Sequence, residues 1–409
     1  MNKKYTPGPQ IHSEASTQGN THALVGKVVF VLSKINIGRM NLTLPDGSCH
    51  TLGPGGLPEA TMVINRWRAV RRLMTQGDMG FVESYLDGDW DSPDPSKVVE
   101  IAVINRPTVK SNELDGFWHR LLNRIAHNWR ANTKSGAKKN IAAHYDLGND
   151  FYSQWLDPTM TYSSAYFTAH DQSLAQAQQE KYKRIAEMLR LQPDHNVLEI
   201  GFGWGGFAEY AIKEHGCHVT GLTLSEEQLK FAGERMQKAG LSHKVDLRLQ
   251  DYRDTGGQFD RIASIEMFEA VGEENWPHYF DMIRNRLVQG GEAALQIITI
   301  DESHFTRYRS GADFIQRYIF PGGMLPTVTA LKQEIDRARL QLADVNTFGE
   351  SYAQTLLQWR QRFIDAWSNI EPLGFDVRFR RMWEMYLAYC EGGFRAKSID
   401  VGHFKLRRI

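Results

Sequence analysis

The stretch that decides the fold is Val197-Leu198-Glu199-Ile200-Gly201-Phe202-Gly203-Trp204-Gly205-Gly206. An apolar strand runs into a glycine-rich turn, and a helix with apolar periodicity begins near Phe207. Glycines let a ligand approach the backbone, and the N-terminus of a helix favours negatively charged groups. Gly201, Gly203 and Gly206 also satisfy the dinucleotide pattern GxGxxG. The turn therefore predicts either a dinucleotide site or a site for S-adenosylmethionine (SAM), or else a purely structural turn.

The residues after the second strand favour SAM. A dinucleotide site needs an acidic side chain at the end of that strand, where it binds a ribose hydroxyl. Here the strand ends Gly221-Leu222-Thr223-Leu224-Ser225, and the first carboxylate is Glu226. Thr, Ser and Gln side chains can bind ribose hydroxyls where no acid is available. Glu199, two residues before the first glycine, also fits a SAM loop better than a dinucleotide loop.

Strand and helix patterns alternate on both sides of this turn, which predicts an α/β fold with a parallel, doubly wound sheet. Strands are expected at residues 195–203, 218–224, 245–250, 261–267 and 293–300. Two last strands, at 338–345 and 399–406, are expected at the sheet edge, and a helix near 276–288 is expected to end at Gly290-Gly291. Residues 301–336 carry no clear strand and are interpreted as a lid insertion.

Composition divides the chain into four parts. We expect a disordered tail at 1–20, a small α+β domain at 21–110, a basic amphipathic linker helix at 111–141 and the α/β domain at 142–409. From Lys110 to Ile141 there are seven Lys and Arg against two acids, with tryptophans at helical spacing. Such a helix can lie on anionic lipid, or it can pack its apolar face on the next domain. Both interpretations remain open.

Charge and cysteine content exclude several classes of protein. The 48 Lys and Arg equal the 48 Asp and Glu, which argues against a nucleic-acid partner along the whole chain. Cys49, Cys217 and Cys390 lie far apart, so we expect neither a disulfide framework nor a metal site. No apolar run approaches the roughly 18 to 20 residues of a membrane span, and no signal-peptide core is visible. We expect a cytoplasmic protein, peripherally associated with the inner face of the membrane.

Several further motifs resemble the cyclopropane-fatty-acyl-phospholipid synthase family of mycolic acid cyclopropane synthase-like, SAM-dependent methyltransferases. They occur in the family's order from about residue 140 to the C-terminus. They are HYDLGND (144–150), YSSAY (162–166), GLTLSEEQ (221–228), LQDYRD (249–254), EMFEAVG (266–272), YIFPGG (318–323) and YCEGGFR (389–395). The resemblance implies a class I methyltransferase fold with a mostly parallel seven-stranded sheet and a smaller α+β N-terminal domain. It also implies a homodimer and a role of the N-terminal domain at the bilayer.

The activity implied by the resemblance is transfer of a one-carbon unit from SAM to the cis double bond of a phospholipid acyl chain, which forms a cyclopropane. The implied partner is a phospholipid surface with unsaturated chains. The residues that the resemblance places on SAM are Tyr162, Ser163, Glu199, Gly201, Gly203, Gly205, Gly206, Thr223, Ser225, Gln228, Gln250, Asp251 and Tyr252. Methyl transfer leaves a cation on the chain, which aromatic faces can stabilise. The aromatic candidates are Tyr145, Tyr162, Tyr166, Phe268, Tyr318 and Tyr352.

Two candidates exist for the base that removes the final proton. In the family a bound bicarbonate is the base. It is held by a Cys, a Glu, a His, a backbone group near an Ile, and a Tyr. The Glu, Tyr and Ile match Glu269, Tyr352 and Ile298, but Ser164 replaces the Cys and Gln296 the His. Ser and Gln keep hydrogen-bonding capacity but do not titrate near neutral pH. Either bicarbonate still binds and a ring closes, or Glu269, alone or with water, is the base.

In the second case the product is a methylene- or methyl-branched chain, and a reductase partner is implied for the methyl branch. Two other readings are a SAM methyltransferase of a small soluble substrate and a membrane-binding protein with a vestigial SAM fold. Cys390 matches a cysteine usual in the family and has either a direct role or a packing role. Glu266, three residues before Glu269, could form a carboxylate pair that tunes one pKa near a cationic ligand, but we favour the interpretation that it ends a strand and bonds backbone.

Overall fold

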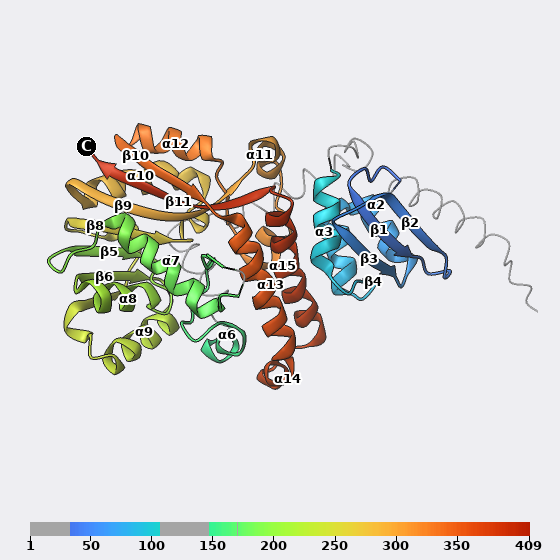
Figure 1. The fold of residues 1–409 in the computed structure, drawn as a ribbon, viewed down its shortest axis with the longest axis horizontal. Coiled ribbons are helices and arrows are strands. Elements are labelled where there is room, and N and C mark those ends of the chain that lie inside the picture. Colours follow the sequence, from blue (N-terminus) through green and yellow to red (C-terminus); the bar gives the residue numbers. More distant parts are fainter. Residues whose placement is uncertain (1–32, 107–146, 170) are drawn as a thin grey trace, which may run out of the picture.

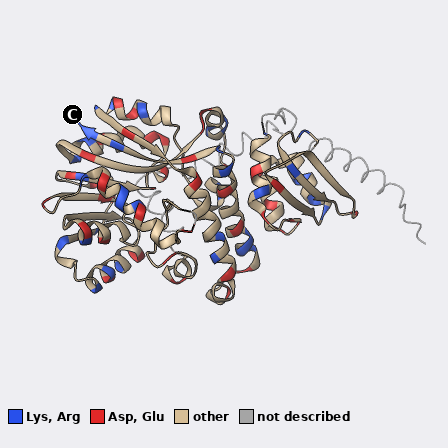
Figure 2. Ribbon diagram, in the orientation of Figure 1, with Lys and Arg blue, Asp and Glu red and all other residues tan. Residues whose placement is uncertain are grey.

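The computed structural model describes residues 33–106, 147–169 and 171–409, which form two sheets with their helices (Figure 1). The predicted tail at 1–20 and the predicted basic helix at 111–141 lie outside the described residues. Lys and Arg are interspersed with Asp and Glu along the described ribbon (Figure 2). Within these ranges, no helix is both long enough and apolar enough to cross a membrane.

The smaller, N-terminal sheet has the strand order β2-β1-β3-β4. Its strands are β1 (Gly38–Thr43), β2 (Cys49–Gly55), β3 (Glu59–Ile64) and β4 (Trp90–Asp91), and only the β1–β3 pair is parallel. Helices α2 (Trp67–Leu86) and α3 (Pro95–Ile104) accompany it. Helix α2 is interrupted at Gly77, whose φ of 57° and ψ of −136° are not helical. Glycine adopts this conformation without a steric penalty from a Cβ atom.

The larger sheet has seven strands in the order β10-β11-β9-β8-β5-β6-β7, and it confirms the predicted α/β class. The strands are β5 (Asn196–Ile200), β6 (His218–Thr223), β7 (Val245–Leu249), β8 (Phe259–Ile265), β9 (Leu287–Ile300), β10 (Leu340–Thr347) and β11 (Ile399–Arg408). Strands β5 to β9 pair in parallel, whereas β11 is antiparallel to both of its neighbours.

Two details of the sequence prediction were wrong. Strand β11 is not at the edge, because it inserts between β9 and β10 and only β10 lies outermost. Gly290-Gly291 does not end the preceding helix: α10 (Trp276–Arg286) stops earlier, and both glycines lie inside β9. Gly290 has a φ of 76°, and the β8–β9 register shifts beside it, so the glycines allow an irregular start of a long strand.

Helices cover both faces of the sheet because successive strand side chains point to opposite faces. Val197 packs in a core with α7 (Leu174–Leu189) and α8 (Gly206–His215). Its neighbour Leu198 packs in another core with α10 and α12 (Val328–Arg337). Helix α9 (Glu226–Lys238) follows β6. The glycine turn therefore joins a strand that is buried on both sides to a helix.

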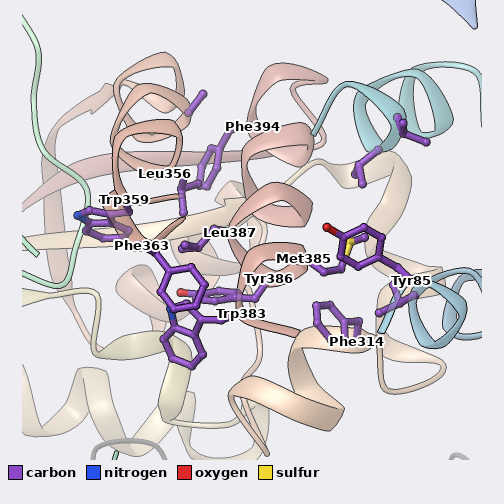
Figure 3. Close-up of a cluster of buried hydrophobic side chains, with 14 of the residues drawn as sticks. Tyr85, Phe314, Leu356, Trp359, Phe363, Trp383, Met385, Tyr386, Leu387 and Phe394 are labelled. Atoms are coloured by element: carbon purple, nitrogen blue, oxygen red, sulfur yellow. The ribbon is translucent and has the colours of Figure 1, made fainter. Parts of the chain in front are cut away.

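A helical layer joins the two sheets. It contains α6 (Asn149–Trp155), α13 (Gly349–Asp365), α14 (Trp367–Ile370) and α15 (Val377–Arg395), with α13 beside α15 and α15 against α3 (Figure 1). Gly392 permits the α3 contact, since a Cβ there would lie 2.8 Å from Val99. Figure 3 shows aromatic and aliphatic side chains of α13 and α15 gathered with Tyr85 of α2 and Phe314. This apolar layer fixes the N-terminal elements against the seven-stranded sheet.

Residues 301–336 contain no strand, in agreement with the sequence. They form α11 (Glu302–Arg309), a π-helical turn (Ile315–Ile319) and α12. The interpretation of this segment as a lid stays a prediction.

Candidate functional site

A cavity of about 920 Å³ opens at the carboxyl ends of the parallel strands, where ligands bind in open α/β sheets. Ten of the thirteen residues predicted to bind SAM line it. They are Tyr162, Ser163, Glu199, Gly201, Gly203, Gly206, Thr223, Gln228, Gln250 and Tyr252. Gly205, Ser225 and Asp251 do not line it. Their predicted contact with the cofactor stays untested.

The backbone of the glycine turn lines the cavity and packs closely against neighbouring side chains, which leaves no room for a Cβ atom at two of its glycines. Gly201 has a φ of 81°, and a Cβ there would lie 3.0 Å from Cγ of Met267. A Cβ at Gly206 would lie 2.3 Å from the hydroxyl of Tyr182. The turn is fastened to β6, because the N–H groups of Gly201 and Phe202 both donate to the carbonyl of Leu222. Larger residues would change the shape of this end of the cavity.

The three predicted residues outside the lining make structural contacts with their neighbours. Gly205, with a φ of 81°, precedes α8 as its N-cap. The hydroxyl of Ser225 accepts a hydrogen bond from the Gln228 N–H at 3.2 Å and caps α9. Asp251 accepts from Arg253 and caps a short 3₁₀ turn. These contacts position the residues that do face the cavity.

Two buried titratable groups, Glu199 and Lys181, lie close enough to interact electrostatically. Burial raises the pKa of Glu199 to about 8, and Oε2 of this carboxyl has no hydrogen-bond partner among the described residues. Lys181 of α7 is fully buried and donates to the Ser163 hydroxyl at 2.7 Å. Burial lowers the pKa of Lys181 to about 7. An unpartnered carboxyl oxygen beside open glycine backbone fits a ligand that carries an ammonium or hydroxyl donor, as SAM does.

Our sequence analysis missed Lys181, although a signal was present. Along α7 the buried positions recur at Leu174, Ala177, Gln178, Lys181, Tyr182 and Ile185. This lysine therefore falls on the apolar face of an amphipathic helix. A buried lysine is rare without a partner, so its place in that pattern marks a site.

The predicted catalytic residues divide into two groups. Glu269, Ile298, Tyr352 and Cys390 line the cavity, whereas Ser164 and Gln296 do not. The Ser164 hydroxyl donates to the carbonyl of Ala165 at 2.9 Å and is completely buried. Burial raises the pKa of the Cys390 thiol, so that this group is a neutral thiol near pH 7. The structure thus brings four of these six side chains to one cavity wall.

Glu269 is a buried carboxyl with one free oxygen. It lies in a 3₁₀ turn after β8, and Oε1 accepts from the Ile298 N–H at 2.6 Å. Oε2 has no partner in the described part of the chain. Burial, with a further contribution from the charge of Glu266, raises the pKa of Glu269 to about 8. Near pH 7 this group is therefore mostly a neutral acid.

Glu266 differs from the expectation, because it does more than end a strand. Its carboxylate lines the cavity and accepts three hydrogen bonds. Oε1 accepts from the Ser164 N–H at 2.8 Å and from Nε2 of Gln296 at 2.7 Å, and Oε2 accepts from the Tyr352 hydroxyl at 2.7 Å. Burial raises the pKa of Glu266, while these donors and Lys181 oppose the shift. The favoured interpretation, backbone contacts alone, was wrong, and the carboxylate pair that the sequence also allowed is present.

His403 holds the Gln296 side chain in one orientation. Nε2 of Gln296 donates to the Ser164 carbonyl as well as to Glu266, so the amide oxygen must accept from Nε2 of His403 at 2.9 Å. Burial lowers the pKa of His403 to about 3, so the imidazole is neutral. Sequence reasoning missed His403, which is distant along the chain and pairs with Gln296 only through the β9–β11 register.

The aromatic candidates are also distributed unevenly. Tyr162 and Tyr352 line the cavity, whereas Tyr166, Phe268 and Tyr318 do not, and Tyr145 lies outside the described residues. Helix α15 adds Tyr386, Tyr389 and Phe394, which the sequence analysis did not single out. The hydroxyls of Tyr162 and Tyr386 are 2.8 Å apart. The cavity wall next to the carboxylates is therefore rich in aromatic rings.

The cavity continues away from the sheet into an apolar end. Met79 and Val82 of α2 and Val99 and Val103 of α3 line it, together with Phe314. Polar side chains line this end too, among them the partly buried Asp313 and the exposed Asp78, which pairs with Arg106 at 2.5 Å and with Arg307 at 3.4 Å. No group of His, Cys, Asp and Glu that could hold a metal ion is found in residues 33–106, 147–169 or 171–409.

Comparisons with known proteins agree with this arrangement. Residues 132–404 match the family model described as mycolic acid cyclopropane synthetase. The chain is 38% identical to the tuberculostearic acid methyltransferase UfaA1 of Mycobacterium tuberculosis, over 83% of this chain and 81% of that protein. It is 39% identical to the cyclopropane-fatty-acyl-phospholipid synthase of Escherichia coli K12, over 81% of this chain and 83% of that protein.

Among solved structures, the mycolic acid cyclopropane synthase CmaA1 complexed with SAH and CTAB superposes with a TM-score of 0.62. It is 30% identical, and the match covers 66% of this chain and 98% of that chain. The predicted class I methyltransferase fold is thereby confirmed. The chain belongs to the mycolic acid cyclopropane synthetase family of SAM-dependent methyltransferases.

Proposed function

We propose that this protein transfers a methyl group from SAM to the cis double bond of a long acyl chain, with an unsaturated phospholipid as the substrate. One observation carries the proposal. A single cavity runs from the glycine turn, past Glu266 and Glu269, to an apolar end between α2 and α3. A small soluble substrate would not need that apolar end, whereas an acyl chain would fill it.

When bound, SAM supplies an electrophilic methyl group. The chain's own residues provide the surroundings that a weak alkene nucleophile needs. The glycine turn and the apolar end can hold the two reactants in one water-poor space. The faces of Tyr162, Tyr352 and Tyr386 can stabilise positive charge on the acyl chain. The buried carboxylate of Glu266 adds a negative charge next to these rings.

The product that we propose is a branched chain. The cation can lose a proton to close a ring, to form a methylene group after a hydride shift, or to leave a methyl group on a displaced double bond. The side chains of Gln296 and Tyr352, which the family resemblance would assign to bicarbonate, here donate to Glu266, as does the backbone N–H of Ser164. This arrangement favours a base different from the one that closes the ring in cyclopropane synthases.

A cyclopropane product is the second candidate. Glu269, Ile298 and Tyr352 all line the cavity, as the resemblance to cyclopropane synthases requires, and the Ile298 N–H donates to Glu269. A bicarbonate could then contact the free oxygen of Glu269, if Glu266 moved aside. This candidate predicts that the rate depends on added bicarbonate.

A product assay separates the candidates. The protein is incubated with SAM and vesicles of a dioleoyl phospholipid, with and without bicarbonate, and the released chains are analysed by proton NMR. Vinylidene protons or a vinylic methyl signal would establish a branched product. High-field ring protons would establish the cyclopropane instead. No one-carbon gain in any lipid, with SAM binding intact in calorimetry, would overturn the proposed function.

Association with the membrane surface is part of the same proposal. The basic segment at 111–141 and the cations Arg307, Arg309 and Arg317 would contact anionic lipid. The double variant Arg124→Glu/Arg130→Glu should weaken binding to anionic vesicles in sedimentation and leave SAM affinity unchanged. Unchanged vesicle binding would contradict a role of that segment.

A further inference from the structure

We propose that Glu266 is the built-in base that removes the proton from the methylated acyl chain. This inference rests on the proposed function, since it assigns a residue to the last step of that reaction. Its basis is the geometry of the carboxylate, which lines the reaction cavity and is held by donors from three separate segments: the loop at Ser164, β9 and α13.

The hydrogen bonds leave one basic position open. A carboxylate has two oxygens with about four lone-pair sites. Oε1 uses both of its sites, for the Ser164 N–H and the Gln296 amide. Oε2 receives one donor, the Tyr352 hydroxyl, and keeps one site. A proton taken from substrate would enter at that site on Oε2.

The neighbouring carboxyl is less suited to this role. Glu269 accepts one hydrogen bond, from the Ile298 N–H, and carries a pKa of about 8 because it is buried and lies near Glu266. Near pH 7 it already holds a proton. Two carboxyls close together cannot both ionise readily, so the one with three donors keeps the negative charge. Glu266 is therefore the anion, and Glu269 the acid.

The backbone at Glu266 is held in an unusual conformation. Its φ is 50°, in the left-handed region that residues with a Cβ rarely adopt. Its N–H donates to the Gln296 carbonyl at 2.9 Å, which fixes this conformation at the end of β8. Strain of this kind persists where the surroundings impose it, and it is common at functional sites. Here it directs the side chain toward Tyr352 and the cavity.

A second layer of contacts fixes the donors themselves. The neutral imidazole of His403 donates to the Gln296 amide oxygen, which leaves the amide nitrogen to donate to Glu266. Phe348 and Tyr166 pack on the imidazole ring, at centroid distances of 4.6 and 6.2 Å. The donors are thus in place before substrate binds, which lowers the reorganisation needed in the reaction.

The proposed step is balanced. After methyl transfer, the acyl chain carries one positive charge and Glu266 one negative charge. A C–H bond of the chain breaks, its electron pair forms the new carbon–carbon bond or double bond, and the proton binds Oε2 of Glu266. Both groups become neutral. The proton then passes to water when the product leaves, and the carboxylate is restored.

The test uses the full-length protein, dioleoyl phospholipid vesicles and SAM. Glu266→Gln keeps the shape of the side chain but removes the base. Glu266→Gly removes the side chain and suits a φ of 50°, so it leaves space for a small anion. Both variants are assayed in buffer freed of carbon dioxide, with and without formate or bicarbonate. SAM affinity and melting temperature are measured for each, as a control for folding.

A general base contributes about 10²- to 10⁴-fold to a rate, so we expect Glu266→Gln to lose at least about 100-fold in kcat. Formate or bicarbonate should raise the rate of Glu266→Gly at least about tenfold and should leave the rate of Glu266→Gln unchanged. The wild-type rate should not depend on bicarbonate.

Three results would overturn the inference: a Glu266→Gln rate within about threefold of wild type, no anion rescue of Glu266→Gly, or a bicarbonate requirement in the wild type. An inactive wild type would count against the proposed function itself, and that outcome is distinct from all three.

Discussion

The two ends of the cavity are built in different ways. The end at the glycine turn comes from short, contiguous motifs on β5, β6 and β8, and it is lined by backbone and polar side chains. The far end comes from α2, α3, α15 and residues 301–325, which are distant in sequence, and it is mostly apolar. A polar site depends on individual atoms, whereas an apolar site depends on volume. The first end should therefore be intolerant of single substitutions and the second more tolerant.

The largest effect should come from Gly201→Val at the polar end. A valine would have to adopt a φ of 81° with its Cβ 3.0 Å from Met267. We expect SAM affinity to fall at least about 100-fold in calorimetry, because the backbone must shift. Gly240→Val is a matched control: it has a φ of 72° and no atom within 4 Å of a Cβ. Unchanged SAM affinity in Gly201→Val would contradict the expectation that the polar end is intolerant of single substitutions.

A smaller effect is expected from Val103→Trp at the apolar end. The larger ring should fill part of the cavity and lower the rate on oleoyl chains by about tenfold, with less effect on shorter chains. SAM affinity should not change. Leu57→Trp, at a side chain that is 85% exposed, is the surface control. An equal loss for all chain lengths would argue that this end does not hold the acyl chain.

Glu269 lies between the two ends, and its pKa predicts a pH-dependent stability. Burial raises the pKa of Glu269 from 4.5 in the unfolded chain to about 8. The contribution of this group to the free energy of unfolding is therefore fully present below pH 4.5, and it is lost as the pH rises to about 8. Glu269→Gln removes this loss. The variant should gain stability over wild type between pH 5 and 7.5, by at most about 1.4 kcal/mol per pH unit in urea unfolding.

Glu292 provides the control of opposite sign. Although burial opposes the shift, hydrogen bonds from Arg190 and Lys405 lower the pKa of Glu292. Glu292→Gln should therefore destabilise the protein at neutral pH, and the loss should shrink in acid. If Glu269→Gln and Glu292→Gln both increased stability at neutral pH, the loss of a charge alone would not explain the result for Glu269.

The smallest effect should come from Asp78→Asn at the rim of the apolar end. Its carboxylate is 53% exposed and pairs with Arg106 and Arg307. Exposed ion pairs contribute about 0 to 1 kcal/mol, so unfolding in urea should change by less than about 1 kcal/mol. A larger loss would mean that this ion pair helps to hold α2 against α11.

Much of the polar end was predictable. The glycine turn, Thr223 and Gln228 follow strands of the sheet, and parallel strands place their carboxyl ends at one edge. The exceptions are residues whose effect depends on contacts between distant segments. Lys181 and His403 were missed, and the favoured interpretation of Glu266 was backbone contacts alone. Its three donors come from residues 164, 296 and 352, and sequence spacing does not reveal that they meet.

The sequence by itself determined the fold class and the place of the glycine turn, because alternating patterns and glycine backbone are local properties of the chain. It also supplied the substitutions Ser164 and Gln296. Only the tertiary structure decided that the Gln296 amide donates to Glu266, whereas the Ser164 hydroxyl donates to the Ala165 carbonyl. The charge of a buried carboxylate depends on how many donors surround it. For Glu266 that number is fixed by packing β8, β9 and α13 together, a long-range property that no local pattern contains.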